Sequence, residues 1–238
     1  GEAKMLLRKH FGEHIFLLPQ CSAAGDQCPV DLVRWVEPES DVHDPNLKRT
    51  NPHKRKADPS MFDLSGMRKA GKRIANEIIE VYNEGLDAPQ TDPEFVHEVH
   101  MMQLPLRRTT FAEVAAARRR IHDYLAEKPG DVDFNDAAAL QVDLGILRRE
   151  ELQEKMDILD TESHILRLGT VAFATNPFEL FLDFGNQIKA RSYAEQTFLI
   201  QLANGTEGYL PTEKAEKGGH YSAFLASGLV GHAGGEQL

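Results

Sequence analysis

Three short apolar runs, each followed at once by a turn-rich segment, constrain most strongly how this chain can fold. The runs are 15–18, 171–175 and 198–202, and runs of this kind bounded by turn residues are typical of buried strands. The segments that follow carry these reactive side chains: Asp26 and Cys28, then Glu179, then Tyr209. Loops at the carboxyl ends of parallel strands form sites at one edge of an α/β sheet. If the strands run parallel, we expect the three segments to meet.

Helical and strand periodicities alternate along the rest of the chain and predict an α/β fold with a mixed β-sheet core and flanking helices. An amphipathic helix is predicted over 67–82, with an apolar face formed by Met67, Ala70, Ile74, Ile78 and Val81. Strands are predicted over 95–107, 163–168, 170–175 and 197–202, and a further helix over 178–190.

A helical hairpin is predicted in the middle of the chain. Thr110 is a candidate N-cap with Glu113 in the capping-box position, and the apolar stripe of the helix that follows contains Phe111, Val114, Ile121 and Leu125. The sequence KPGD ends this helix at 128–131. A second helix is predicted over 135–156, so two antiparallel helices are expected between 110 and 156.

The charge balance excludes a general nucleic-acid binder. The chain has 27 basic and 37 acidic residues and a net charge of −10, whereas phosphate contacts need an excess of Lys and Arg. No apolar run approaches the ~20 residues that a membrane-spanning helix needs, so no transmembrane segment is predicted. The polar, proline-rich stretch 37–59 is expected to be a surface loop.

Each candidate side chain also has a purely structural interpretation. In the sequence NPFE at 176–179, Asn176 fits an N-cap, Pro177 the first helical position and Glu179 the third, and spacing alone favours this capping role. Tyr209 and Tyr221 fit half-buried tyrosines with one hydrogen bond each. Cys28 fits a small buried apolar residue.

The histidines and cysteines give weaker signals. His97 and His100 are spaced three apart on a predicted strand, where their side chains point to opposite faces, so a shared metal is not expected. His220 is interpreted as a loop residue. Cys21 and Cys28 bracket small residues in a predicted site loop, and we expect them not to be joined by a disulfide.

Three segments together resemble the neutral/alkaline, non-lysosomal ceramidase family. AAGDQCP at 23–29 is similar to the family's A-G-D-x-S-P loop, and 171–191 is similar to its strand, acidic turn and helix. The segment 202–221 is similar to the part of the family that carries two tyrosines twelve positions apart, as Tyr209 and Tyr221 are. The resemblance is collinear over about 5–30 and 160–235.

The resemblance implies a zinc-dependent amidase that hydrolyses an N-acyl lipid or another amide, with ceramide cleaved to fatty acid and sphingosine as the family default. Zinc is bound in the family by two histidines, a glutamate and a tyrosine. The last two correspond to Glu179 and Tyr209. Tyr221 would donate a hydrogen bond to the developing oxyanion, and Asp26 would fix its loop by bonding its own backbone. Cys28 replaces the family serine, which leaves the specificity for ceramide open.

The family's two zinc histidines precede its A-G-D loop. We therefore expect residues 1–238 to be the C-terminal portion of a ceramidase-like domain, inactive alone and weak in zinc binding. Two alternatives remain open: a divergent hydrolase of the same fold acting on another amide or ester, and a non-catalytic interaction module that uses the surface of the 110–156 hairpin. The resemblance alone suggests a secreted or membrane-associated protein, and the sequence does not predict the oligomeric state.

Overall fold

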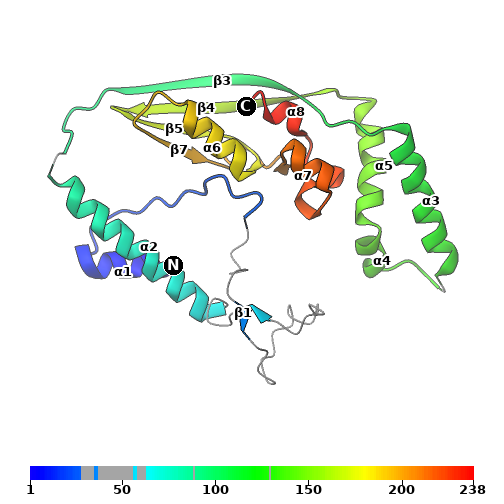
Figure 1. The fold of residues 1–238 in the computed structure, drawn as a ribbon, viewed down its shortest axis with the longest axis horizontal. Helices are drawn as coiled ribbons and strands as arrows, with labels where there is room; N and C mark the ends of the chain where they lie inside the picture. Colours follow the sequence, from blue (N-terminus) through cyan, green and yellow to red (C-terminus); the bar gives the residue numbers. More distant parts are fainter. Residues whose placement is uncertain (28–34, 37–55, 58–62, 88, 129) are drawn as a thin grey trace. The chain divides into compact units, whose positions relative to one another are not determined.

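The computed structural model describes residues 1–27, 35–36, 56–57, 63–87, 89–128 and 130–238 (Figure 1). The chain divides into two compact units. Unit 1 contains 1–19 and 28–92, and unit 2 contains 20–27 and 93–238. Most of the stretch 37–59, which we expected to be a surface loop, lies outside the described residues. Its described part, β2 (Lys56–Ala57), pairs antiparallel with β1 (Trp35–Val36).

Unit 1 is built on two packed helices, α1 (Glu2–Phe11) and α2 (Asp63–Gly85). Leu7 of α1 and Ala75 of α2 are fully buried. A Cβ atom added at Gly71 would lie 2.6 Å from the Cβ of Glu2, so the missing side chain permits this close approach. The predicted helix is confirmed, but its long apolar side chains are exposed, because α2 uses its small residues to contact α1.

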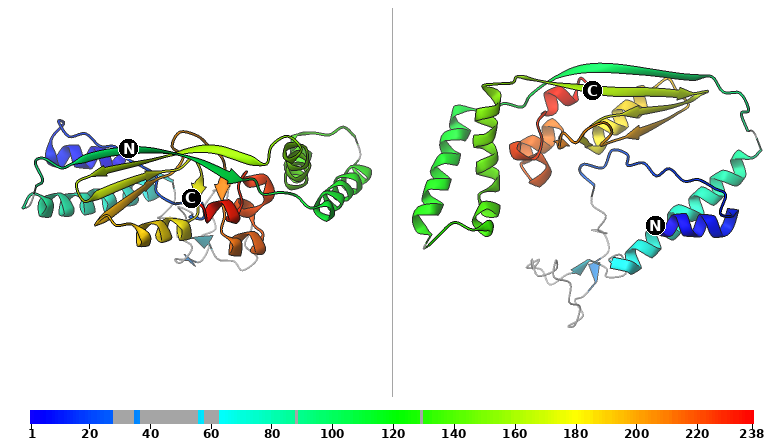
Figure 2. Two further views of the ribbon diagram at one scale, coloured as in Figure 1. Left: turned by 90° about the horizontal axis from the view of Figure 1, so that it is seen from above. Right: turned by 180° about the vertical axis from the view of Figure 1, so that it is seen from behind.

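Unit 2 contains the mixed sheet that the sequence predicts. Its strands are β3 (Phe95–Pro105), β4 (Ile158–Leu168), β5 (Val171–Thr175) and β7 (Gln196–Ile200), in the order β3-β4-β5-β7. The first two pairings are antiparallel, whereas β5 and β7 are parallel. The crossover between these parallel strands contains helix α6 (Leu182–Arg191), which lies on one side of the sheet (Figure 2).

The predicted helical hairpin is also present. It contains α3 (Phe111–Glu127), the short α4 (Phe134–Ala139) and α5 (Gln141–Gln153). Thr110 and Glu113 form the expected capping box at the start of α3. The second helix was predicted as one piece, but it breaks at Leu140, whose ψ of 4° is not helical. Phe111 is 89% exposed although its spacing places it on the apolar stripe.

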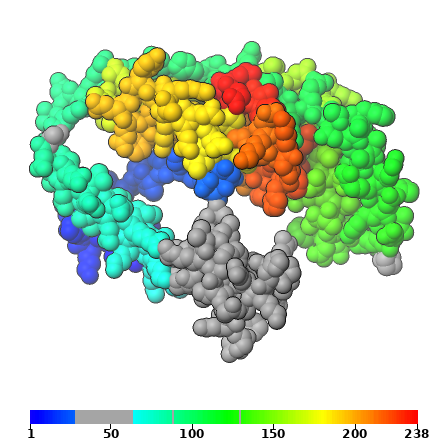
Figure 3. Space-filling model, in the orientation of Figure 1, coloured from blue at the N-terminus to red at the C-terminus, as the bar shows by residue number. Residues whose placement is uncertain are grey.

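Short elements complete unit 2 at the C-terminal end. They are β6 (Glu179–Leu180), β8 (Tyr209–Leu210), α7 (Glu213–Gly218), the 3-10 turns η3 (Tyr221–Ala223) and η4 (Leu225–Ser227), and α8 (His232–Gly235). Figure 3 shows α7 and α8, in orange and red, packed directly beside α6 in yellow. Among the described residues, no helix is both long and apolar enough to cross a bilayer.

The main core of unit 2 lies between the sheet, α6 and these short elements. Phe178, Leu180, Leu210 and Val230 are at most 1% exposed and belong to one apolar cluster. The same cluster receives Leu104 from β3, so strands far apart in the sequence share it. A smaller cluster, Val114, Ala117, Ile146 and Leu225, joins the hairpin to η4.

Two predicted elements differ from the structure. The run 15–18 does not form a strand; it is irregular, and Phe16 is 96% exposed, because no described strand pairs with it. The helix predicted to start at 178 starts at Leu182, because Glu179 and Leu180 form strand β6 instead. Only two of the three expected parallel strands therefore exist.

Candidate functional site

Glu179 and Tyr209 lie opposite each other on two short parallel strands. β6 and β8 pair in the register Glu179↔Tyr209, and the Glu179 amide donates to the Gly208 carbonyl at 2.9 Å. Directly paired residues of a ladder direct their side chains to the same face. The structure thus brings together the two residues to which the resemblance assigns zinc binding.

Tyr221 joins this pair from the η3 turn. The rings of Tyr209 and Tyr221 are 5.7 Å apart between centroids, with an angle of 72° between their planes, which is an edge-to-face contact. The pKa of the Tyr209 phenol is raised above its ordinary value, chiefly by burial and then by hydrogen bonds with Glu179 and Tyr221. Tyr209 therefore lies between the Glu179 strand position and the ring of a second tyrosine.

The interpretation of Glu179 as a helix cap is wrong. The Asn176 side chain accepts a hydrogen bond from the Phe178 amide at 3.1 Å, which closes a turn and does not begin a helix. The helix begins three residues after Glu179, and the Glu179 amide is already bonded to β8. Pairing with a strand thirty positions later thus overrides the local capping pattern.

Asp26 fixes the site loop, but not through its own backbone as expected. Its Oδ1 accepts a hydrogen bond from the amide of Leu182 at 2.8 Å, the first residue of α6. The neighbouring Gly25 amide donates to the Leu180 carbonyl at 2.8 Å. Asp26 therefore satisfies a free helix N–H group and ties the 20–27 segment to the junction of β6 and α6.

A buried glutamine that the sequence analysis did not single out organises the same junction. Gln201 Oε1 accepts hydrogen bonds from the amides of Ala24 and Leu180, both at 3.1 Å, and its Nε2 donates to Cys21 Sγ at 3.3 Å. Gln201 directly follows β7 and belongs to the run 198–202. The sequence did contain a signal for this residue, namely a glutamine near the end of an apolar run. A side-chain amide that is buried in such a run needs several hydrogen-bond partners.

Cys28 lies outside the described residues, so its place in the site stays a prediction. Cys21 is a free, exposed cysteine. It precedes the site loop, and its backbone carbonyl accepts a hydrogen bond from the Gln201 amide at 2.9 Å. The small residues after it pack closely, since Ala23 is buried against α6.

The histidines form contacts elsewhere in unit 2. His97 Nε2 lies 2.8 Å from Nδ1 of His164, which also contacts Glu162 at 2.9 Å, whereas His100 pairs with Glu98 at 3.2 Å. His97 and His100 thus have separate partners, as expected of opposite strand faces. Within the described ranges, no group of three or more His, Cys, Asp or Glu residues is arranged to hold a metal ion.

The geometry defines what these residues can do chemically. One carboxylate and one phenol oxygen point to the same face, and a second phenol stands beside them. Such a set offers two hard oxygen ligands to a cation and an O–H donor to an oxygen that develops negative charge.

Comparison with known proteins adds no relative: no protein-family model, curated protein or solved structure matches the chain.

Proposed function

We propose that residues 1–238 are the later part of a ceramidase-like zinc amidase that hydrolyses an N-acyl amide. One observation carries the proposal: Tyr209 adjoins both Glu179 and Tyr221, three residues that were named from two short sequence patterns and are separated by up to 42 positions. The structural alternatives for these residues require no such meeting.

The described donors fit zinc in kind but not in number. Glu179 and Tyr209 supply two oxygens, whereas catalytic zinc usually has three protein ligands. The remaining ligands would come from outside the described residues. When bound, zinc would polarise the amide carbonyl and lower the pKa of its water.

The roles of the chain's own residues follow from their contacts. Glu179 orients the Tyr209 oxygen, and Tyr221 approaches Tyr209 edge-on from a separate turn. Tyr221 would donate its hydroxyl proton in a hydrogen bond to the amide oxygen as that oxygen gains negative charge. Asp26 and Gly25 hold β6, and with it Glu179, in place.

The test compares matched variants in the natural full-length protein. Glu179→Gln and Tyr209→Phe should each lose bound zinc and amide hydrolysis together. Tyr221→Phe should keep its zinc, while its kcat on an N-acyl sphingoid amide falls about 10²–10³-fold, as after loss of one oxyanion donor. The controls are Glu195→Gln and Tyr193→Phe, which alter exposed residues of unit 2.

Two results would overturn the proposal. Zinc content that is unchanged in both Glu179→Gln and Tyr209→Phe would exclude these residues as ligands. A full-length protein that carries zinc but cleaves no N-acyl amide would exclude the amidase activity.

A further inference from the structure

The short turn that contains Tyr221 does not by itself hold the Tyr221 side chain in one position. Tyr221 begins the 3-10 turn η3, is 60% exposed, and lies in the arm 219–230, which contains only short turns. Positioning a phenol beside Tyr209 therefore requires contacts from elsewhere in the fold. Part of those contacts comes from the helical hairpin, for which the resemblance gives no role.

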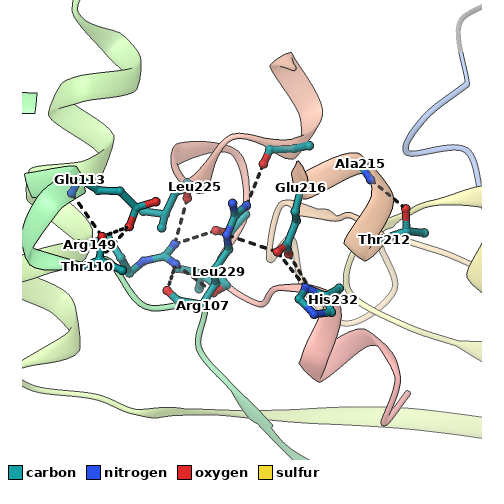
Figure 4. Close-up of polar contacts among 12 residues, drawn as sticks. Arg107, Thr110, Glu113, Arg149, Thr212, Ala215, Glu216, Leu225, Leu229 and His232 are labelled. Atoms are coloured by element: carbon teal, nitrogen blue, oxygen red, sulfur yellow. Dashed lines mark hydrogen bonds and ion pairs between the residues drawn. The ribbon is translucent and has the colours of Figure 1, made fainter. Parts of the chain in front are cut away.

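Arg149 of α5 is buried against residues 225–229 of this arm. Its guanidinium donates to the carbonyl oxygens of Arg107 at 2.6 Å, Gly228 at 2.6 Å and Leu229 at 3.1 Å, with a longer bond of 3.4 Å to Leu225 (Figure 4). Burial and the nearby Arg107 charge lower its pKa. Among the described residues, no carboxylate forms an ion pair with Arg149, so backbone carbonyls are its partners.

A second set of contacts fixes the other side of the arm. Arg107 Nη1 donates to the Ala223 carbonyl at 2.7 Å, and its Nε lies 3.7 Å from Glu216. Glu216 in turn accepts from the His232 amide at 2.7 Å and contacts its Nδ1 at 2.8 Å (Figure 4). Arg107 thus connects η3 to α7 and α8.

Close backbone packing completes the attachment. A Cβ atom added at Gly145 of α5 would lie 2.1 Å from the Cβ of Ala226 in η4. Within the arm, the Ser227 hydroxyl donates to the Tyr221 carbonyl. The order of Tyr221 therefore depends on α5 through contacts to η4 and to Gly228 and Leu229, which follow it.

We propose that Arg149 is a positioning residue for Tyr221 and that the helical hairpin is the platform that holds the Tyr221 hydroxyl beside Tyr209. Arg149 acts through the backbone and not on a substrate. Only the catalytic consequence rests on the proposed function; the positioning itself is a property of this chain without metal.

The first experiment follows the arm directly in the metal-free chain. In Arg149→Met, amide hydrogen exchange of 219–230 should become about tenfold faster while β4 keeps its protection, because only the local attachment is lost. Arg149→Lys should restore part of the protection, since an ammonium can bond fewer of the carbonyls. Arg148→Met, the exposed neighbour on the same helix, is the matched control.

A spectroscopic cycle tests whether Arg149 acts through Tyr221. Carbon-labelled tyrosine NMR resolves the five tyrosines, and the ring signals of Tyr209 report its edge-to-face contact with Tyr221. Arg149→Met and Tyr221→Leu should each shift the Tyr209 ring signals, because each removes the Tyr221 ring from its place 5.7 Å away. Their double variant should shift no further than the larger single effect.

Gly145→Ala keeps the test decisive if Arg149→Met fails to fold. Alanine is the better helix former by about 1 kcal/mol, so α5 itself should be retained. The added methyl should nevertheless displace η4 and accelerate exchange of the arm. Unchanged exchange of 219–230 in folded Arg149→Met or Gly145→Ala, or additive effects in the cycle, would overturn the proposal, whatever the protein's activity proves to be.

Discussion

At the scale of single residues, glycines let three backbone segments surround the Glu179–Tyr209 pair. A Cβ atom added at Gly25 would lie 2.1 Å from the Glu179 carbonyl oxygen, and one at Gly228 would lie 2.0 Å from that of Tyr209. Gly208 has a φ of +77°, in the left-handed region that other residues rarely adopt. The small residues before Asp26 thus serve close packing against β6.

Gly25→Ala tests this close approach. The new methyl should force β6 away from the 20–27 segment and lower the free energy of unfolding by about 1–3 kcal/mol, the usual cost of overpacking. Urea denaturation measures the change. Gly218→Ala is the control, since a Cβ there meets no atom within 4 Å, and it should stay within about 0.5 kcal/mol of the parent chain. Equal effects at the two positions would contradict the packing argument.

At the scale of elements, the start of α4 depends on one buried carboxylate. Asp136 accepts hydrogen bonds from the Asp133 amide at 2.6 Å and from the Tyr124 hydroxyl at 3.0 Å, and it pairs with Lys128. These bonds, the Asp133 amide first, lower the pKa of Asp136 below its ordinary 3.8. The carboxylate thereby joins the C-terminal end of α3 to α4.

The lowered pKa predicts how stability depends on pH. A carboxyl group with a depressed folded pKa stabilises the fold above its unfolded pKa, and this contribution is lost as the pH falls through and below about 4. Asp136→Asn should therefore destabilise the chain at pH 7, and the difference from the parent should shrink below pH 4. Urea unfolding at several pH values measures it. Asp131→Asn, in the exposed loop before α4, is the control, and its free energy of unfolding should equal that of the parent at each pH. A difference in stability between Asp136→Asn and the parent that does not change with pH would refute the linkage.

At the scale of the molecule, unit 2 has one main core that the site elements share with the sheet. Phe178 is fully buried in the cluster that also contains Leu104 of β3, Leu210 of β8 and Val230. Phe178, the residue before Glu179, thus packs in the main core of unit 2. Because the site strands are only two residues long, their geometry depends on this core more than on their own hydrogen bonds.

Phe178→Ala should therefore destabilise unit 2 by about 3–5 kcal/mol, as expected when a large buried side chain leaves a cavity. The change should appear in denaturant unfolding followed by far-ultraviolet circular dichroism. Phe111→Ala is the matched control, because that side chain is 89% exposed, and its effect should stay within about 0.5 kcal/mol. A loss below 1 kcal/mol at Phe178 would show that the core does not depend on it.

The sequence by itself determined the elements whose causes are local. Strand β3 follows from its apolar run, and α3 follows from a helical period that starts at the capping box formed by Thr110 and Glu113. The helical hairpin and the mixed sheet could be predicted for the same reason. Local spacing also brought out Glu179 and Tyr209 as candidates, and the family resemblance added Tyr221, although neither could decide between capping and a shared site.

Only the tertiary structure decided how those candidates are held. The start of α6 depends on Asp26, 156 positions before it, and Arg149 bonds to carbonyls as far as 80 positions away. Glu179 became a strand residue because β8 supplied hydrogen bonds that its own neighbours could not, whereas 15–18 found no strand partner. A backbone N–H or C=O group bonds to whichever partner the folded chain brings within hydrogen-bond distance, and the local sequence does not identify that partner.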